Sequence, residues 1–170
     1  MQALNLKENF MEVEFTITED EYAKASVLFS RPSKKLKLFY FLAIVSMSCS
    51  LFVVNSVQLK FAIVGGLIGS VIGFSVFRYV LAPWNARKQY RKYKAIKEPV
   101  IVSLLSSGIL FKSNSGQGKL EWPYIHKWRQ DENFVLIYQA PNLYHILPKR
   151  IGNVVNSISQ SLSLQVGNEI

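Results

Sequence analysis

Two long apolar stretches, separated by three residues, constrain this chain more than any other feature. Leu38–Val57 holds no charged residue, and Phe61–Leu81 holds one, Arg78. A helix needs about 20 residues, at ~1.5 Å each, to cross the roughly 30 Å hydrocarbon core of a bilayer. Each stretch is long enough, so the sequence predicts two membrane-spanning helices. The short connection, Gln58–Lys60, predicts that they form an antiparallel hairpin.

Two other interpretations of these stretches are less well supported. A helical hairpin buried in a soluble protein is disfavoured because two uncharged runs of near-spanning length are uncommon in soluble cores. A cleaved signal peptide is disfavoured because the first run follows an acidic segment and no small-residue cleavage pattern is present. Arg78 can extend its guanidinium to the membrane interface. Pro83 and Trp84 mark the expected exit of the second span.

The charge distribution predicts the orientation of the hairpin. The net charge is +9, but residues 31–97 carry twelve bases and no acid, whereas residues 1–30 carry two bases and six acids. The bases flank the two stretches, and the connection between them holds only Lys60. By the positive-inside rule, both termini are expected in the cytoplasm. Because the basic block surrounds apolar spans, we expect membrane lipids as a partner and no nucleic acid.

Small residues recur along both apolar stretches. Gly65, Gly69 and Gly73 lie four residues apart, and Ser46 and Ser50 form a matching pair on the first stretch. This spacing places the glycines on one helix face and lets another backbone approach closely. Packing against the chain's own first helix is the favoured interpretation, since a hairpin brings that neighbour close. A homo-oligomer assembled through the glycine face is the alternative.

Residues 84–98 alternate bases with aromatic residues and predict a helix that lies along the membrane surface. Ala86, Tyr90 and Tyr93 recur at helical spacing. Four bases are the candidate contacts for anionic lipid: Arg87, Lys88, Arg91 and Lys92. The alternative is that these bases act only as a topology signal and attract lipid without specificity.

The remaining segments predict a small α+β domain outside the hairpin. Glu12–Thr18 alternates polar and apolar residues as a half-buried strand does. Thr18 and Glu21 have the spacing of a capping box, so a helix should run from about Glu19 toward Phe29. After Pro99, short β-type runs alternate with turns, and Ile151–Leu162 then has the apolar spacing of an amphipathic helix that covers the sheet. The expected divisions are residues 1–30, 31–83, 84–98 and 99–166.

Several of these segments together resemble the YcxB-like proteins of bacterial membranes. The resemblance rests on the strand-then-helix start Val13–Tyr22, the hairpin of two spans, and a later run. The later run comprises Gly108-Ile109, Trp122–Ile125, the aliphatic strand ending at Tyr138, and Ile146–Arg150. It implies a pleckstrin-homology-like (PH-like) β domain on the cytoplasmic side of a bacterial inner membrane, with no established catalytic residue. The expected fold class is therefore α+β, with a two-helix transmembrane hairpin and a PH-like antiparallel β domain closed by a C-terminal helix.

The sequence holds few residues that could carry catalysis. It has two histidines, His126 and His145, and one cysteine, Cys49, within the first apolar stretch. No metal-binding, phosphate-binding or nucleophile motif is present, so we expect no cofactor, no metal and no enzymatic activity.

The favoured function is that of a non-enzymatic, multi-pass inner-membrane protein whose cytoplasmic domain binds an unknown protein or lipid headgroups. An immunity protein that neutralises a bacterial toxin is the alternative. A lipid sensor, and a lipid-modifying enzyme dependent on the histidines, are further hypotheses.

Overall fold

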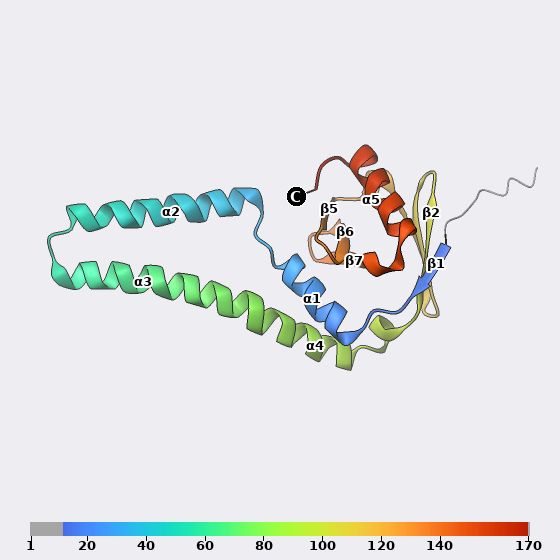
Figure 1. Cartoon of the computed structure of the whole chain (residues 1–170), viewed down its shortest axis with the longest axis horizontal. Coiled ribbons are helices and arrows are strands. Elements are labelled where there is room, and N and C mark those ends of the chain that lie inside the picture. Colours follow the sequence, from blue (N-terminus) through green and yellow to red (C-terminus); the bar gives the residue numbers. More distant parts are fainter. Residues whose placement is uncertain (1–11, 170) are drawn as a thin grey trace, which may run out of the picture.

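The computed structural model describes residues 12–169 and consists of an apolar helical hairpin that projects from a globular α+β domain (Figure 1). The hairpin is formed by α2 (Lys34–Val53) and α3 (Val57–Val76). Neither helix contains a buried residue, and both are long and apolar enough to cross a membrane. The predicted α+β class and the two candidate spans are therefore confirmed.

The connection of the hairpin differs from the expected one. Residues 54–56 join the helices, and Gln58–Lys60 form part of the first two turns of α3. The prediction was wrong because polar residues were assigned to the loop. The first turns of a helix accept polar residues readily, since their N–H groups lack partners within the helix.

The second helix continues through Pro83, where the second span was expected to leave the membrane, into the helix expected after Trp84. A π-helical turn, η1 (Phe77–Leu81), connects α3 directly to α4 (Ala82–Lys92), so one helix runs from Val57 to Lys92. Pro83 has no N–H to donate, and a wider turn precedes it, in which the Ala82 N–H donates to the Phe77 carbonyl. The proline therefore coincides with a change of helical geometry rather than an end. At ~1.5 Å per residue the 36 residues span about 54 Å, well beyond one hydrocarbon core.

The globular domain contains two antiparallel sheets. The first has the order β1 (Glu12–Phe15), β2 (Val100–Leu105), β3 (Gly108–Ser113), β4 (Gly116–Glu121). The second has the order β5 (Lys127–Gln130), β6 (Phe134–Ala140), β7 (Leu143–Pro148). Three short 3-10 turns connect these elements. They are η2 (Lys94–Lys97) before β2, η3 (Trp122–Tyr124) between β4 and β5, and η4 (Lys149–Ile151) after β7. Because β1 pairs with β2, a strand before the hairpin joins a sheet formed after it.

The main core lies between the two sheets and α5 (Asn153–Gln165). Val102 and Ile109 from the first sheet meet Val135 and Leu147 from the second, and all four are fully buried. From α5, the fully buried residues are Val155, Ile158 and Leu162. The helix therefore covers the apolar face of the sheets, as its spacing predicts.

A second core fixes α1 (Glu19–Phe29) to the outer face of the second sheet. Ala25 and Leu28 pack against Phe134, Leu136 and Tyr138 of β6. Alternate residues of β6 thus contribute to both cores, which explains its continuous apolar run. The capping box forms as predicted: the Glu21 N–H donates to Thr18 Oγ1, and the Thr18 N–H donates to the Glu21 carboxylate at 2.9 Å.

Candidate functional site

Helices α1 and α4 lie side by side beneath the globular domain and form the surface that we call the α1–α4 bracket (Figure 1). Ala23 and Ala86 are buried, which lets the two helices approach closely. The Tyr22 and Tyr90 rings lie 6.1 Å apart, and the Tyr90 hydroxyl donates to the Ile17 carbonyl at 2.9 Å. The basic helix is thus packed against α1, and its position relative to a membrane surface stays a prediction.

The four predicted lipid-contact bases are all exposed on α4, but they have different neighbours. Arg87 pairs with Asp20 at 2.9 Å, and Arg91 pairs with Glu19 at 2.7 Å. Lys88 lies over the Trp84 ring, and Lys92 lies over the Tyr93 ring. Exposed ion pairs contribute about 0–1 kcal/mol each, so they orient the two arginines without removing them from solvent. Lipid contact by these four bases stays a prediction.

Arg150 makes a contact that sequence reasoning missed. Its guanidinium donates to both carboxylate oxygens of Glu21 and, at 2.8 Å, to the Thr16 carbonyl. Hydrogen bonds from Arg150 hold the pKa of Glu21 below its ordinary value. The capping-box pattern identifies Glu21 but holds no sign of its second partner, which lies 129 residues later. This contact ties the segment after β7 to the start of α1.

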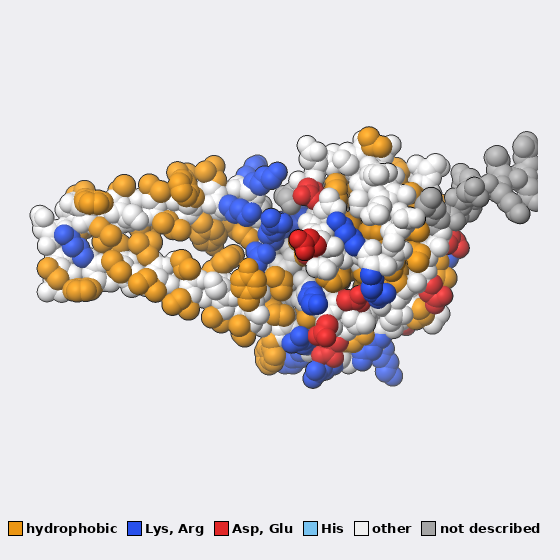
Figure 2. All heavy atoms as spheres, in the orientation of Figure 1, with side chains coloured by type: hydrophobic (Ala, Val, Ile, Leu, Met, Phe, Trp, Pro, Cys, Tyr) orange, Lys and Arg blue, Asp and Glu red, His pale blue; other side chains and the backbone are white. Residues whose placement is uncertain are grey.

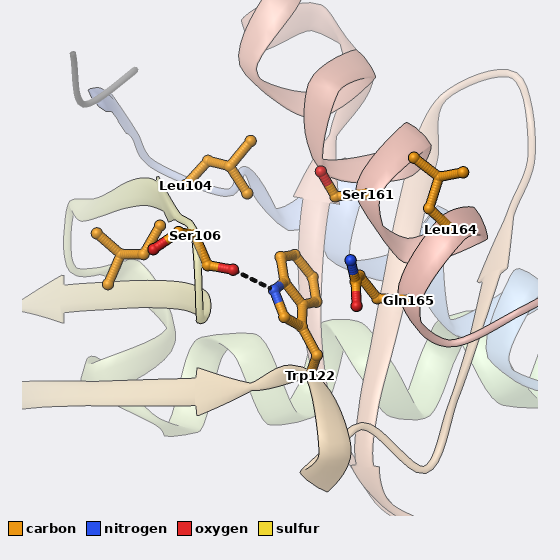
Figure 3. Close-up of a pocket in the computed structure, with 7 residues that line it drawn as sticks. Leu104, Ser106, Trp122, Ser161, Leu164 and Gln165 are labelled. Carbon is orange, nitrogen blue, oxygen red and sulfur yellow. Dashed lines mark hydrogen bonds between the residues drawn. The ribbon is translucent and has the colours of Figure 1, made fainter. Parts of the chain in front are cut away.

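A cavity of about 280 Å³ opens between the β2–β3 turn and α5 (Figure 3). Trp122 lines one side, and its indole N–H donates to the Ser106 carbonyl at 3.0 Å. Leu104, Leu105, Ser161, Leu164 and Gln165 complete the lining. None of these side chains titrates near neutral pH, so they supply hydrogen bonds and apolar contact but no general acid or base.

The two histidines occupy different environments. The His145 ring stacks on Phe111 of the other sheet with centroids 4.1 Å apart, and burial lowers its pKa below the ordinary value. His126 is exposed, and its backbone N–H donates to the Tyr138 carbonyl. Within residues 12–169, no group of three or more His, Cys, Asp or Glu residues could hold a metal ion.

The predicted glycine face is not packed against α2. A Cβ added at Gly65, Gly69 or Gly73 would meet no atom within 4 Å, whereas one at Gly66 would meet the Met47 side chain at 3.8 Å. The favoured interpretation, packing of the glycines on the chain's own first helix, was therefore wrong for these three positions. Because Gly66 meets Met47 and its neighbour Gly65 does not, α2 lies against a different face of α3. The two helices also diverge toward the globular domain (Figure 1).

The predicted serine pair, Ser46 and Ser50, lies on α2. The Ser50 hydroxyl donates to the Met47 carbonyl within α2, and Ser46 is exposed. Association of Gly65, Gly69 and Gly73 with a second copy stays a prediction.

The described geometry defines a class: an α+β domain of two antiparallel sheets joined through a helical bracket to an apolar hairpin. Residues 104–152 match the model of the family described as YcxB-like protein. The match runs from β2 to the glycine before α5 and includes Trp122 and Arg150. The predicted family resemblance is confirmed over this segment. No curated protein and no solved structure matches the chain.

Proposed function

We propose that this chain is a non-enzymatic, two-span protein of a bacterial inner membrane, whose hairpin holds the α+β domain at the cytoplasmic surface for contact with a protein or lipid headgroups. The observation that carries the proposal is an apolar hairpin without a buried residue, beside a domain with its own cores (Figure 2). Phe52 is 90% exposed and Phe61 is 74% exposed. Side chains of this size need a non-aqueous solvent or a covering partner.

The shared cores support placing both flanks of the hairpin on one side of the membrane. Phe15 precedes the hairpin and packs with Val102, which follows it. Leu28 likewise packs with Leu136 from β6. Two segments that build one core cannot be separated by a bilayer, so an even number of spans follows if the hairpin is inserted.

Charge supports the cytoplasmic side. Basic side chains gather where the hairpin joins the domain, and the far end carries only Lys60 (Figure 2). Under the positive-inside rule, the end that retains these bases faces the cytoplasm. The cavity beside Trp122 supports a binding role, because its apolar and amide lining suits an apolar side chain of a partner.

Cysteine labelling in intact cells tests this topology. The native cysteine is first removed by Cys49→Ser, and a single cysteine is then introduced at the hairpin tip (Asn55→Cys) or near the C-terminus (Asn168→Cys). A membrane-impermeant maleimide should label the tip variant in intact spheroplasts of a bacterial host. It should label the C-terminal variant only after the cells are permeabilised. Labelling of the C-terminal variant from outside refutes the proposed orientation.

A further inference from the structure

A cavity of about 320 Å³ lies where the apolar hairpin meets the globular domain. Three bases from separate parts of the chain line it: Lys24 from α1, Arg31 from the turn before α2, and Arg78 from the π-helical turn. Its apolar side is formed by Val27, Leu28 and Phe134. The cavity therefore presents a concentrated positive charge next to an apolar wall.

The one acid in the lining does not neutralise this charge. Asp131 accepts hydrogen bonds from the backbone N–H groups of Asn133 and Phe134, at 2.8 and 2.7 Å. In the described part of the chain, neither Asp131 nor another acid forms an ion pair with Lys24, Arg31 or Arg78. The lining thus carries two more positive than negative charges.

Arg78 also has an unused donor. Its Nε is buried and has no hydrogen-bond partner among residues 12–169. A buried donor without an acceptor is costly, and charged donors are the most costly of all. The guanidinium has the fork geometry that binds the oxygens of a phosphate.

The helix lengths place this cavity at the depth of lipid headgroups. Arg78 follows the start of α3 by 21 residues, or about 32 Å, and α2 spans about 30 Å from its tip back to Lys34. Both distances match the hydrocarbon thickness of a bilayer. If the tip lies at the far boundary, Arg78 lies at the near one, where lipid phosphates are.

We propose that this cavity binds the phosphate group of an anionic phospholipid from the leaflet next to the domain. Lys24, Arg31 and Arg78 bind the phosphate oxygens, Val27 and Leu28 contact the glycerol carbons, and the acyl chains follow the apolar surfaces of α2 and α3. This inference rests on the proposed membrane insertion and deepens it by naming the lipid class. The site is separate from the four bases of α4, none of which lines the cavity.

The test measures lipid retention by the full chain in a non-ionic detergent, using native mass spectrometry with added dioleoylphosphatidylglycerol. The variant Lys24→Gln/Arg31→Gln/Arg78→Gln should lose at least tenfold in apparent affinity. The matched control Lys34→Gln/Lys35→Gln/Lys60→Gln removes the same charge away from the cavity and should change affinity less than threefold. Arg31→Glu alone reverses one exposed charge and should also weaken retention if the triple variant does not fold.

Two further measurements test whether the bound phosphate belongs to a lipid. Their outcomes also distinguish failure of this inference from failure of the proposed function. Dioleoylphosphatidylcholine should be retained less than the anionic lipid, and glycerol 3-phosphate at the same concentration should not displace the lipid. Equal loss in the cavity and control variants, or displacement by glycerol 3-phosphate, overturns the inference. A chain that inserts with the proposed topology but shows no selective retention loses this inference alone. Failure to insert overturns the proposed function as well.

Discussion

The contact between Glu21 and Arg150 allows a quantitative test of how the segment after β7 is tied to α1. The change is Glu21→Gln combined with Arg150→Gln in a double-mutant cycle. Glutamine at this position retains the capping box, so the cycle isolates the ion pair. Hydrogen bonds to a charged group contribute about 1.5–3 kcal/mol, but exposed pairs contribute about 0–1 kcal/mol. The Glu21 side chain is 18% exposed and Arg150 is 52% exposed, so we expect a coupling of about 1 kcal/mol.

The assay is thermal unfolding of the full chain in detergent, followed by circular dichroism at pH 7. A coupling of that size corresponds to a shift of about 2–4 °C in the unfolding midpoint of a chain this long. A parallel cycle on Asp20 and Arg87 is the control. These side chains are 73% and 50% exposed, so their coupling should stay below about 0.5 kcal/mol.

The coupling energy between Glu21 and Arg150 should also depend on pH. The pKa of Glu21 in the folded chain lies below its ordinary value of 4.5, so the unfolded chain binds the proton first as the pH falls. The coupling is therefore fully present above pH 4.5 and is lost as the pH falls through the folded pKa. A coupling near zero at pH 7, or one equal to that of the exposed control pair, would refute the reasoning.

Three more predictions concern the packing of the domain. Burial lowers the pKa of His145 below its ordinary value of 6.5, so the stability of the folded chain should be constant above about pH 6.5 and decline below it. His145→Phe should flatten this dependence in thermal melts from pH 5 to 8, and an unchanged slope counts against the prediction. Gly108→Ala would place a Cβ 2.2 Å from the Leu120 carbonyl oxygen and should cost about 3 kcal/mol in denaturant unfolding, whereas Gly118→Ala, with no atom within 4 Å, should change stability by less than about 0.5 kcal/mol. Buried Arg129 donates to the Phe29 and Arg31 carbonyls. Arg129→Met should therefore lower the free energy of unfolding by about 2 kcal/mol and speed hydrogen exchange at the end of α1. Unchanged exchange would show that these hydrogen bonds do not hold the helix end.

Local signals predicted the elements that depend on neighbours in the sequence. The capping box at Thr18 and Glu21 is contained within four residues, and α1 begins at Glu19 and ends at Phe29 as expected. The short β-type runs expected after Pro99 also form strands, as in the β6–β7 hairpin, whose two strands are joined by a short turn. Both features arise from bonds that close within a few residues.

Features that depend on distant contacts were predicted less well. The sequence predicted a helix on each side of Pro83 but not that a π-helical turn joins them into one, with Ala86 buried beside α1. The glycine spacing predicted a close approach but could not select the partner, because the angle between α2 and α3 is not encoded in either helix alone. The cavity lined by Arg78 joins residues from four parts of the chain, which no local pattern brings together.

The shared cores also impose an order on biosynthesis. Phe15 and Leu28 leave the ribosome before the hairpin, yet their partners Val102 and Leu136 are translated after it. The N-terminal strand and helix must therefore wait, with apolar faces uncovered, until the segments after the hairpin have been translated. For a hairpin inserted as proposed, slow insertion prolongs this interval, so chaperone demand and proteolytic loss should rise together when the insertion machinery is limiting.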